Sequence, residues 1–465
     1  MTYRLSQFDV PADNVFKNDA LNRRPLVDFL TALIERTGGP FVLAIDSSWG
    51  TGKTILVRML QGQLVQQNFS CIYFNAWEVD YVTDPLVALV SCIDSLKIGE
   101  TDKEVTFRDH LKTMRQVTSL VAKRAIVAGT KALTVGALDL EDEMEAIAKD
   151  LAGDSAGDIV EAFHKERSLL KKFREELEAA IAQLPSIGKK PLLVFFIDEI
   201  DRCRPTFAIE LLERIKHLFD VSNILFILSL DKQQLEASIA AVYGQGINAS
   251  EYLRRFIDLE YGLSTVTTKQ FVTSLFSRFE LDEIFAQRTH RELSSDRSTF
   301  ITFFTALADS AQLSLRSQER CFTRLRIVMD QTPADHYLEP VLVALLIVLR
   351  LIEPGLFKRL IRGEATASDV MKYLSGLKNG TILVEGRMGI AIEAYLIASD
   401  ENYDRNEATK ASLVKSIQDK NKPEHIRARD ESVLDFVRQL GRTMRGSPQI
   451  SFVARKIDIA AGLKE

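Results

Sequence analysis

Cysteine and histidine are scarce in this chain of 465 residues, which has four cysteines and six histidines. The cysteines, Cys71, Cys92, Cys203 and Cys321, lie far apart, and no two of them form a C-x-x-C pair. This spacing argues against a disulfide framework and against a zinc site, so we expect four reduced thiols. The histidines are scattered too, and we interpret each as a structural or surface residue and not as a metal ligand.

Long apolar stretches are also missing. The longest, residues 341–349, has nine residues, whereas a helix that spans a bilayer needs about 20, so we interpret this stretch as a buried helix. The amino-terminal MTYRLSQFDV lacks the charged start and the apolar segment of a secretory signal. We therefore expect a cytoplasmic protein without a membrane span.

A large net charge is absent as well, because 59 Lys and Arg against 64 Asp and Glu give −5. This balance gives no general attraction to nucleic acid or anionic lipid, so nucleic-acid binding is not indicated, although a local basic groove is compatible with it. Hydrophobic residues make up 46% and charged residues 26%, as in ordinary globular proteins. The length predicts two or three domains of roughly 100 to 200 residues each.

Four apolar runs have the character of β-strands, at residues 41–45, 71–77, 191–198 and 223–231. Helical spacing follows at 55–67 and 205–219. Strands that alternate with helices predict an α/β fold, with a parallel sheet flanked by helices. From about residue 266 the strand patterns fade. We expect a core at 1–265, a helical lid domain at 266–385 and a helical C-terminal extension at 386–465.

The predicted core contains a helical insertion at about 95–190. Its later part, 164–184, repeats apolar residues with the spacing of an amphipathic helix. Its earlier part, 119–138, is apolar but is interrupted by Lys123, Arg124 and Lys131. Two interpretations stay open for the earlier part: a helical arm that packs on the core, or a helix at an interface or a membrane surface.

The stretch SSWGTGKT, which begins at Ser47, is close to the phosphate-binding pattern G-x-x-x-x-G-K-[ST], with serine in place of the first glycine. Such a loop holds a polyphosphate by backbone N–H groups at a helix amino terminus. Lys53 would contact the terminal phosphates, and the Thr54 hydroxyl would bind Mg²⁺. The alternative is a surface turn. The candidate nucleotide-binding residues are Ser48, Trp49, Gly50, Thr51, Gly52, Lys53, Thr54 and Ile55.

An acidic strand end supports the phosphate-loop interpretation. The run LLVFFIDEIDRC ends its apolar part at Asp198 and Glu199. In nucleotide hydrolases such a pair places one carboxylate at the metal and the other beside the attacking water. The alternative is the acidic first turn of a helix.

Other polar residues are weaker candidates. Ser229 and Asp231, at the end of the fourth predicted strand, are placed to orient the water or to sense the terminal phosphate; an ordinary strand-to-loop transition is the alternative. Arg254 and Arg255 are candidates for an arginine finger that reaches a neighbouring subunit, and Arg316 for a cation from the lid domain. A solvated helix face is the alternative for all three arginines.

Several stretches together resemble the KAP family of P-loop NTPases. In chain order they are SSWGTGKT, FNAWEVDYVTDPL, FFIDEIDRCRP, ILSLDKQQLEASIAAVYG and EYLRRFIDLEY. The resemblance covers roughly residues 15–360. It implies an ATPase of the additional-strand class, related to the STAND and AAA+ proteins, in which Lys53 and Thr54 bind phosphate and magnesium, Asp198 holds the metal and Glu199 is the base.

Two features depart from the family pattern: Ser47 replaces the usual glycine, and the insertion carries charges where many members have transmembrane helices. The resemblance implies a nucleotide-driven switch with ATP and Mg²⁺ as cofactors, which acts as a homo-oligomer with a separate protein effector. Kinship also suggests a role in bacterial defence against phage. The alternatives are a nucleotide-gated oligomeric scaffold with little hydrolysis and, in third place, a nucleic-acid motor.

Overall fold

The structure, a computed structural model, describes residues 10–17, 19, 21–82, 84–93, 110, 112–114, 156–263, 267–290, 293–443 and 449–458. The chain splits near residue 264 into two compact units, the first beginning at Val10 and ending at Ser264, the second containing Thr265–Glu465. The apolar stretch 119–138 lies outside the described residues. The three-domain division predicted from the sequence stays a prediction.

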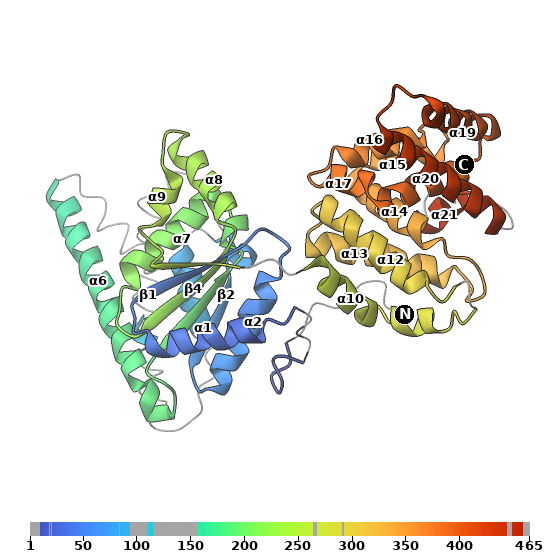
Figure 1. Ribbon diagram of the computed structural model, residues 1–465. Coiled ribbons are helices and arrows are strands. Elements are labelled where there is room, and N and C mark those ends of the chain that lie inside the picture. Colours follow the sequence, from blue (N-terminus) through green and yellow to red (C-terminus); the bar gives the residue numbers. More distant parts are fainter. Residues whose placement is uncertain are drawn as a thin grey trace, which may run out of the picture. The chain divides into compact units, whose positions relative to one another are not determined.

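The first unit is built on a parallel sheet of five strands in the order β2-β3-β4-β1-β5 (Figure 1). The strands are β1 Phe41–Asp46, β2 Ser70–Asn75, β3 Leu193–Asp198, β4 Ile224–Leu230 and β5 Leu259–Gly262. All residues of β3 and β4 are buried, as expected for continuous apolar runs covered on both faces. The predicted α/β fold is confirmed. One strand, β4, lies between β1 and β3, which is the additional-strand arrangement.

Helices cover both faces of this sheet (Figure 1). On one face, α2 packs against β2, β3 and β4, and α1 packs on α2. The other face contributes Ile72, Phe195 and Phe226 to a core that also contains residues of α3, α6, α7 and α8. The bounds are α1 Arg24–Arg36, α2 Lys53–Gln66, α3 Pro85–Ile93, α6 Ala156–Gln183, α7 Pro205–Leu218, α8 Lys232–Tyr243 and α9 Ala249–Leu253.

The described part of the second unit consists of helices. They are α10 Thr268–Arg278, α11 Leu281–Ala286, α12 Asp296–Ser310, α13 Leu315–Asp330, α14 Pro340–Ile352, α15 Pro354–Ile361, α16 Ala367–Ser375, α17 Gly380–Glu385, α18 Arg387–Ala398, α19 Tyr403–Gln418, α20 Glu424–Thr443 and α21 Ile450–Ile457. Every residue of α14 from Pro340 to Leu349 is buried, which confirms the interpretation of this apolar run as a core helix. Among the described residues, no helix combines the length and the apolar character that crossing a membrane requires.

Candidate functional site

The candidate phosphate loop joins the end of β1 to the start of α2. Gly50 has φ 79° and Gly52 has φ 87°, values that L-residues with a side chain rarely adopt. The amide of Ser47 donates to the carbonyl of Leu230 (3.1 Å), which ties the loop to the end of β4. Because α2 begins at Lys53, its first N–H groups have no partner within the helix and point toward the loop. The sequence therefore forms the strand, loop and helix that a phosphate site requires.

Ser47 occupies the place of the first glycine without backbone strain, because it is not among the residues with positive φ. Its hydroxyl donates to Thr51 Oγ1 (2.8 Å), and Thr51 Oγ1 donates to the carbonyl of Ser48 (2.9 Å). The serine thus adds a bond across the loop. This geometry explains physically why the missing glycine is tolerated.

Lys53 is buried at the base of the loop. Its Nζ donates to the carbonyls of Ser48 (3.1 Å) and of Ser47. Burial lowers the pKa of Lys53, and this effect is opposed by nearby carboxylates, first that of Asp201 and then those of Asp231, Asp198 and Asp46. The ammonium therefore lies among negative groups and makes hydrogen bonds to backbone carbonyl oxygens.

Asp198 ends β3 and is almost fully buried. Its Oδ1 accepts the amide of Glu199 (3.0 Å), and its Oδ2 accepts the hydroxyl of Tyr73 on β2 (2.8 Å). Burial, followed by the charge of Asp198, raises the pKa of Tyr73, so this hydroxyl keeps its proton and donates. The Arg58 guanidinium lies 3.2 Å from the centre of the Tyr73 ring. The candidate metal carboxylate is thus fixed in orientation by a neighbouring strand.

Glu199 has φ 62°, which is unusual for a residue with a long side chain. Its carboxylate is bound by two side chains: Arg202 Nη1 lies 2.5 Å from Oε1, and Asn75 Nδ2 donates to Oε2 (3.3 Å). Asn75 is opposite Asp198 in the β2–β3 register. The candidate base is therefore oriented by the ends of β2 and β3 together.

Trp49 connects the loop to the segment that follows β3, because its indole N–H donates to Asp201 Oδ2. Burial raises the pKa of Asp201, whereas the Trp49 hydrogen bond and the charge of Lys53 oppose that shift. Further along, Arg204 donates from N and Nε to the Asp80 carboxylate (2.9 and 2.8 Å). The separate stretches that resembled one family in the sequence are thus in contact in the structure.

Asp201, Tyr73, Asn75 and Arg202 were not among the candidates from the sequence. Asp201 and Arg202 lie within FFIDEIDRCRP, and Asn75 lies within FNAW. These stretches indicated the family resemblance, but they did not indicate what the three residues do. No comparable signal pointed to Tyr73.

The two candidates at the end of β4 differ in their surroundings. Ser229 lies opposite Asp198 in the β3–β4 register, and its buried hydroxyl has no hydrogen-bond partner among the described residues. Asp231 instead caps α8, because its carboxylate accepts the amide of Gln234 (3.4 Å). Ser229 is therefore the one with an unused polar group at the site.

The three candidate arginines differ in their surroundings. Arg254 is exposed and pairs with Glu251 (3.0 Å), and Arg255 lies over the Tyr252 ring at 5.8 Å. Both precede β5, which runs parallel to β1. In their own chain they therefore lie near the amino-terminal ends of the strands, whereas the phosphate loop follows the carboxyl-terminal end of β1. Arg316 is exposed on α13 in the second unit. A finger or sensor role for these residues stays a prediction.

Comparison with known proteins agrees with this geometry. A search of curated proteins gives no match. A family model, described as the KAP family P-loop domain, matches residues 23–330, which is more than half of the chain and includes β1 to β5 and the loop. The chain therefore belongs to the KAP family of P-loop NTPases.

Proposed function

We propose that this chain is a Mg²⁺-dependent ATPase that acts as a nucleotide-driven switch. The observation that carries the proposal is that the phosphate loop, Asp198 and Glu199 all lie at the carboxyl edge of one parallel sheet. Ligands of open α/β sheets bind at this edge. Lys53 faces the same place, with backbone carbonyls as its only protein hydrogen-bond acceptors in the described structure.

The residues present fit magnesium nucleotide. No group of three metal-binding side chains occurs among the described residues, and Mg²⁺ at phosphate sites is usually held by only one or two protein groups together with phosphate and water. Thr54, which is exposed on the first turn of α2, and Asp198 would hold the metal. The loop residues 48–55 would hold the phosphates. Bound Mg²⁺-ATP supplies a phosphorus atom made electrophilic by charge neutralisation.

The protein's own groups then have distinct tasks. Lys53 balances negative charge at the terminal phosphate, and the unused hydroxyl of Ser229 contacts the same region. Glu199, oriented by Arg202 and Asn75, accepts a proton from the attacking water. Tyr73 holds the Asp198 carboxylate in one orientation.

The direct test is phosphate release by the full chain. Lys53→Ala should abolish nucleotide binding, while Glu199→Gln should keep binding and lower turnover by about a hundredfold or more, as expected for loss of a general base. Glu78→Gln is a matched control, because Glu78 is an exposed glutamate that also accepts from Asn75 (3.1 Å). A wild-type rate no higher than that of the Lys53→Ala/Glu199→Gln double variant would refute the proposal.

A second candidate function is a nucleotide-gated oligomeric scaffold with little hydrolysis. The observation in its favour is that both oxygens of Glu199 already have protein partners. Light scattering with and without ATP, on the wild type and on the Glu199→Gln variant in parallel, separates the two functions. A scaffold assembles fully on binding alone, whereas a hydrolysing switch also needs turnover to disassemble.

The biological setting is proposed from kinship alone. It comprises a homo-oligomer in which Arg254, Arg255 or Arg316 completes a neighbour's site, a separate protein effector, and a role in defence of bacteria against phage. Crosslinking from each arginine position to a photoreactive nucleotide tests the first part, because it shows which arginine reaches the nucleotide and from which chain.

A further inference from the structure

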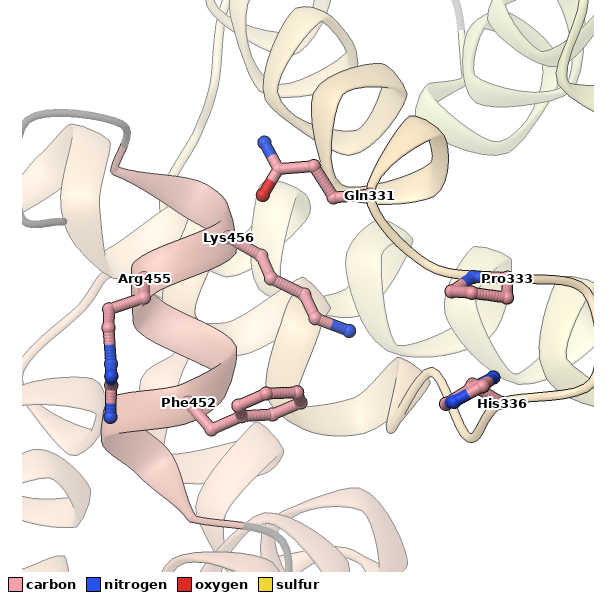
Figure 2. Close-up of a pocket in the computed structure, with 6 residues that line it drawn as sticks. All are labelled: Gln331, Pro333, His336, Phe452, Arg455 and Lys456. Atoms are coloured by element: carbon pink, nitrogen blue, oxygen red, sulfur yellow. The ribbon is translucent and has the colours of Figure 1, made fainter.

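A cavity of about 400 Å³ lies in the second unit, between the last turns of α21 and the loop that follows α13. Figure 2 shows Lys456 extending from α21 toward the loop that carries Pro333 and His336, beside the Phe452 ring. The volume is within the range of small-molecule sites. All six lining residues lie beyond the family match, which ends at residue 330. Its lining residues are Gln331, Pro333, His336, Phe452, Arg455 and Lys456.

The lining is basic. Three of its six side chains, those of His336, Arg455 and Lys456, are basic and none is acidic. Lys456 is partly buried, donates to Thr332 Oγ1 (2.9 Å) and lies 4.6 Å from the centre of the Phe452 ring. In the described part of the chain it forms no ion pair. A partly buried ammonium whose contacts are a hydroxyl and a ring lacks the counter-charge that usually accompanies burial.

Three carboxylates near the cavity already have partners. The pairs are Asp296 with Arg288 (3.0 Å), Asp458 with Arg350 (3.0 Å) and Asp335 with His336 (2.9 Å). None of these three pairs uses Lys456 or Arg455. Lys456 and Arg455 therefore have no carboxylate partner in the described part of this unit, whereas His336 is already paired with Asp335.

The wall opposite α21 is fixed by a buried cation. Arg288 donates to the carbonyl of Pro333 (3.3 Å) and to that of His336, and the amide of His336 donates to the carbonyl of Pro333 (3.0 Å). These bonds hold the turn that presents His336. Burial and then the charge of Arg288 lower the pKa of Lys456.

We propose that this cavity binds a small molecule that carries a phosphate group and a flat apolar part. The phosphate would lie between Lys456 and His336, with the Gln331 amide as a further donor, because several donors around one anion suit a dianion. The flat part would lie against Phe452 and Pro333. Lys456 and Arg455 also lie in the last turn of α21, where cations interact favourably with helix carbonyls. That interaction explains the charges but not the cavity or its fixed opposite wall.

The test uses phenyl phosphate as the probe and isothermal titration calorimetry of the full chain at constant ionic strength. Lys53→Ala serves as the background, so that the phosphate loop does not compete for the probe. Adding Lys456→Met should weaken binding by about tenfold or more, since a charge-assisted bond is lost. Lys420→Met is the matched control, because it removes the same charge from an exposed turn of the same unit and should leave binding unchanged.

Further probes separate the parts of the ligand. Benzoate should bind more weakly than phenyl phosphate, benzyl alcohol should not bind, and Phe452→Ala should weaken phenyl phosphate more than inorganic phosphate. Phe452 is exposed, so its truncation leaves folding intact. Equal affinities of the Lys456→Met and Lys420→Met variants would overturn the proposal. So would benzyl alcohol binding as tightly as phenyl phosphate, or inorganic phosphate binding equally well with and without the Phe452 ring.

Discussion

Lys53 in the phosphate loop is buried and Lys456 in the cavity is partly buried, yet the groups around them are opposite in charge. Lys53 has four carboxylates near it and bonds to two carbonyls. Lys456 has a hydroxyl, an aromatic ring and a guanidinium. The carboxylates around Lys53 repel an anion unless a metal ion neutralises them, whereas the cavity has no such requirement. Under the two proposals, the same side chain would serve a metal-dependent site in one unit and a metal-independent site in the other.

The largest expected effect is the difference in ATP affinity between a variant substituted at Lys53 and a variant substituted at Lys456. Lys53→Ala should weaken ATP binding by about a thousandfold, because it removes a buried charge from the phosphate site. Lys456→Met should leave ATP affinity unchanged. Calorimetric titration with Mg²⁺-ATP measures both, and loss of ATP binding in the Lys456→Met variant would mean that the two sites are not independent.

A second test concerns Glu339, which adjoins the cavity wall through Asp296. Burial, followed by the charge of Asp296, raises the pKa of Glu339 from 4.5 to about 7. The folded chain therefore binds this proton more tightly than the unfolded chain. The resulting stability is complete below about pH 4.5 and is lost as the pH rises through about 7, by at most about 3 kcal/mol.

Thermal unfolding across pH 5 to 8 measures this contribution. Glu339→Gln should unfold with less dependence on pH than the wild type, because an amide does not titrate. Glu431→Gln, an exposed substitution on α20, should follow the wild-type profile. Parallel profiles for all three proteins would show that Glu339 does not titrate in this range. Asp296 and Tyr395 also face this region, because the charges of Glu339 and Asp296, after burial, raise the pKa of Tyr395.

Removing Mg²⁺ should have a smaller effect, and it should change the ligand affinity of only one of the two sites. Chelation of Mg²⁺ should lower ATP affinity by about tenfold or more, because Asp198, Asp201 and Asp46 then repel the phosphates. Phenyl phosphate binding in the cavity should not change. Equal loss at both sites on chelation would contradict the difference in charge described above.

The smallest effect concerns Tyr73. Tyr73→Phe removes one donor from the buried Asp198 carboxylate, a loss of about 1 to 3 kcal/mol in local interaction. We expect the Mg²⁺ concentration for half-maximal turnover to rise several-fold with little change in the maximal rate. Tyr81→Phe, at a highly exposed tyrosine, is the control. A purely structural role for Tyr73 would instead lower thermal stability without shifting the Mg²⁺ dependence.

The sequence predicted those parts of the fold that are recorded in short local patterns. Strands β1, β3 and β4 were found because continuous apolar runs mark strands covered on both faces. Strand β2, whose residues alternate between buried and half-buried, was found from the short run of strand-forming residues at 71–77. Strand β5 was not predicted, because Leu259–Gly262 is short, lies at the sheet edge and is mostly exposed. An edge strand of this kind gains its hydrogen bonds from β1 and has no apolar pattern of its own.

The same distinction holds for the candidate site. The phosphate loop and the Asp198–Glu199 pair were predicted because each is contiguous in the chain. The contacts of Tyr73 with Asp198 and of Trp49 with Asp201 span 125 and 152 residues. They depend on the order and register of the strands, which no local pattern specifies. The placement of Arg254 and Arg255 near the amino-terminal ends of the strands likewise follows from β5, which was not predicted.

The positions of Trp49 and Trp77 have a practical consequence. They are the chain's two tryptophans, both are about half exposed, and they lie in the phosphate loop and directly after β2. Intrinsic tryptophan emission therefore originates entirely from the neighbourhood of the candidate nucleotide site. It provides a label-free optical signal for events at that edge of the sheet, while binding in the second unit alone should leave the spectrum unchanged.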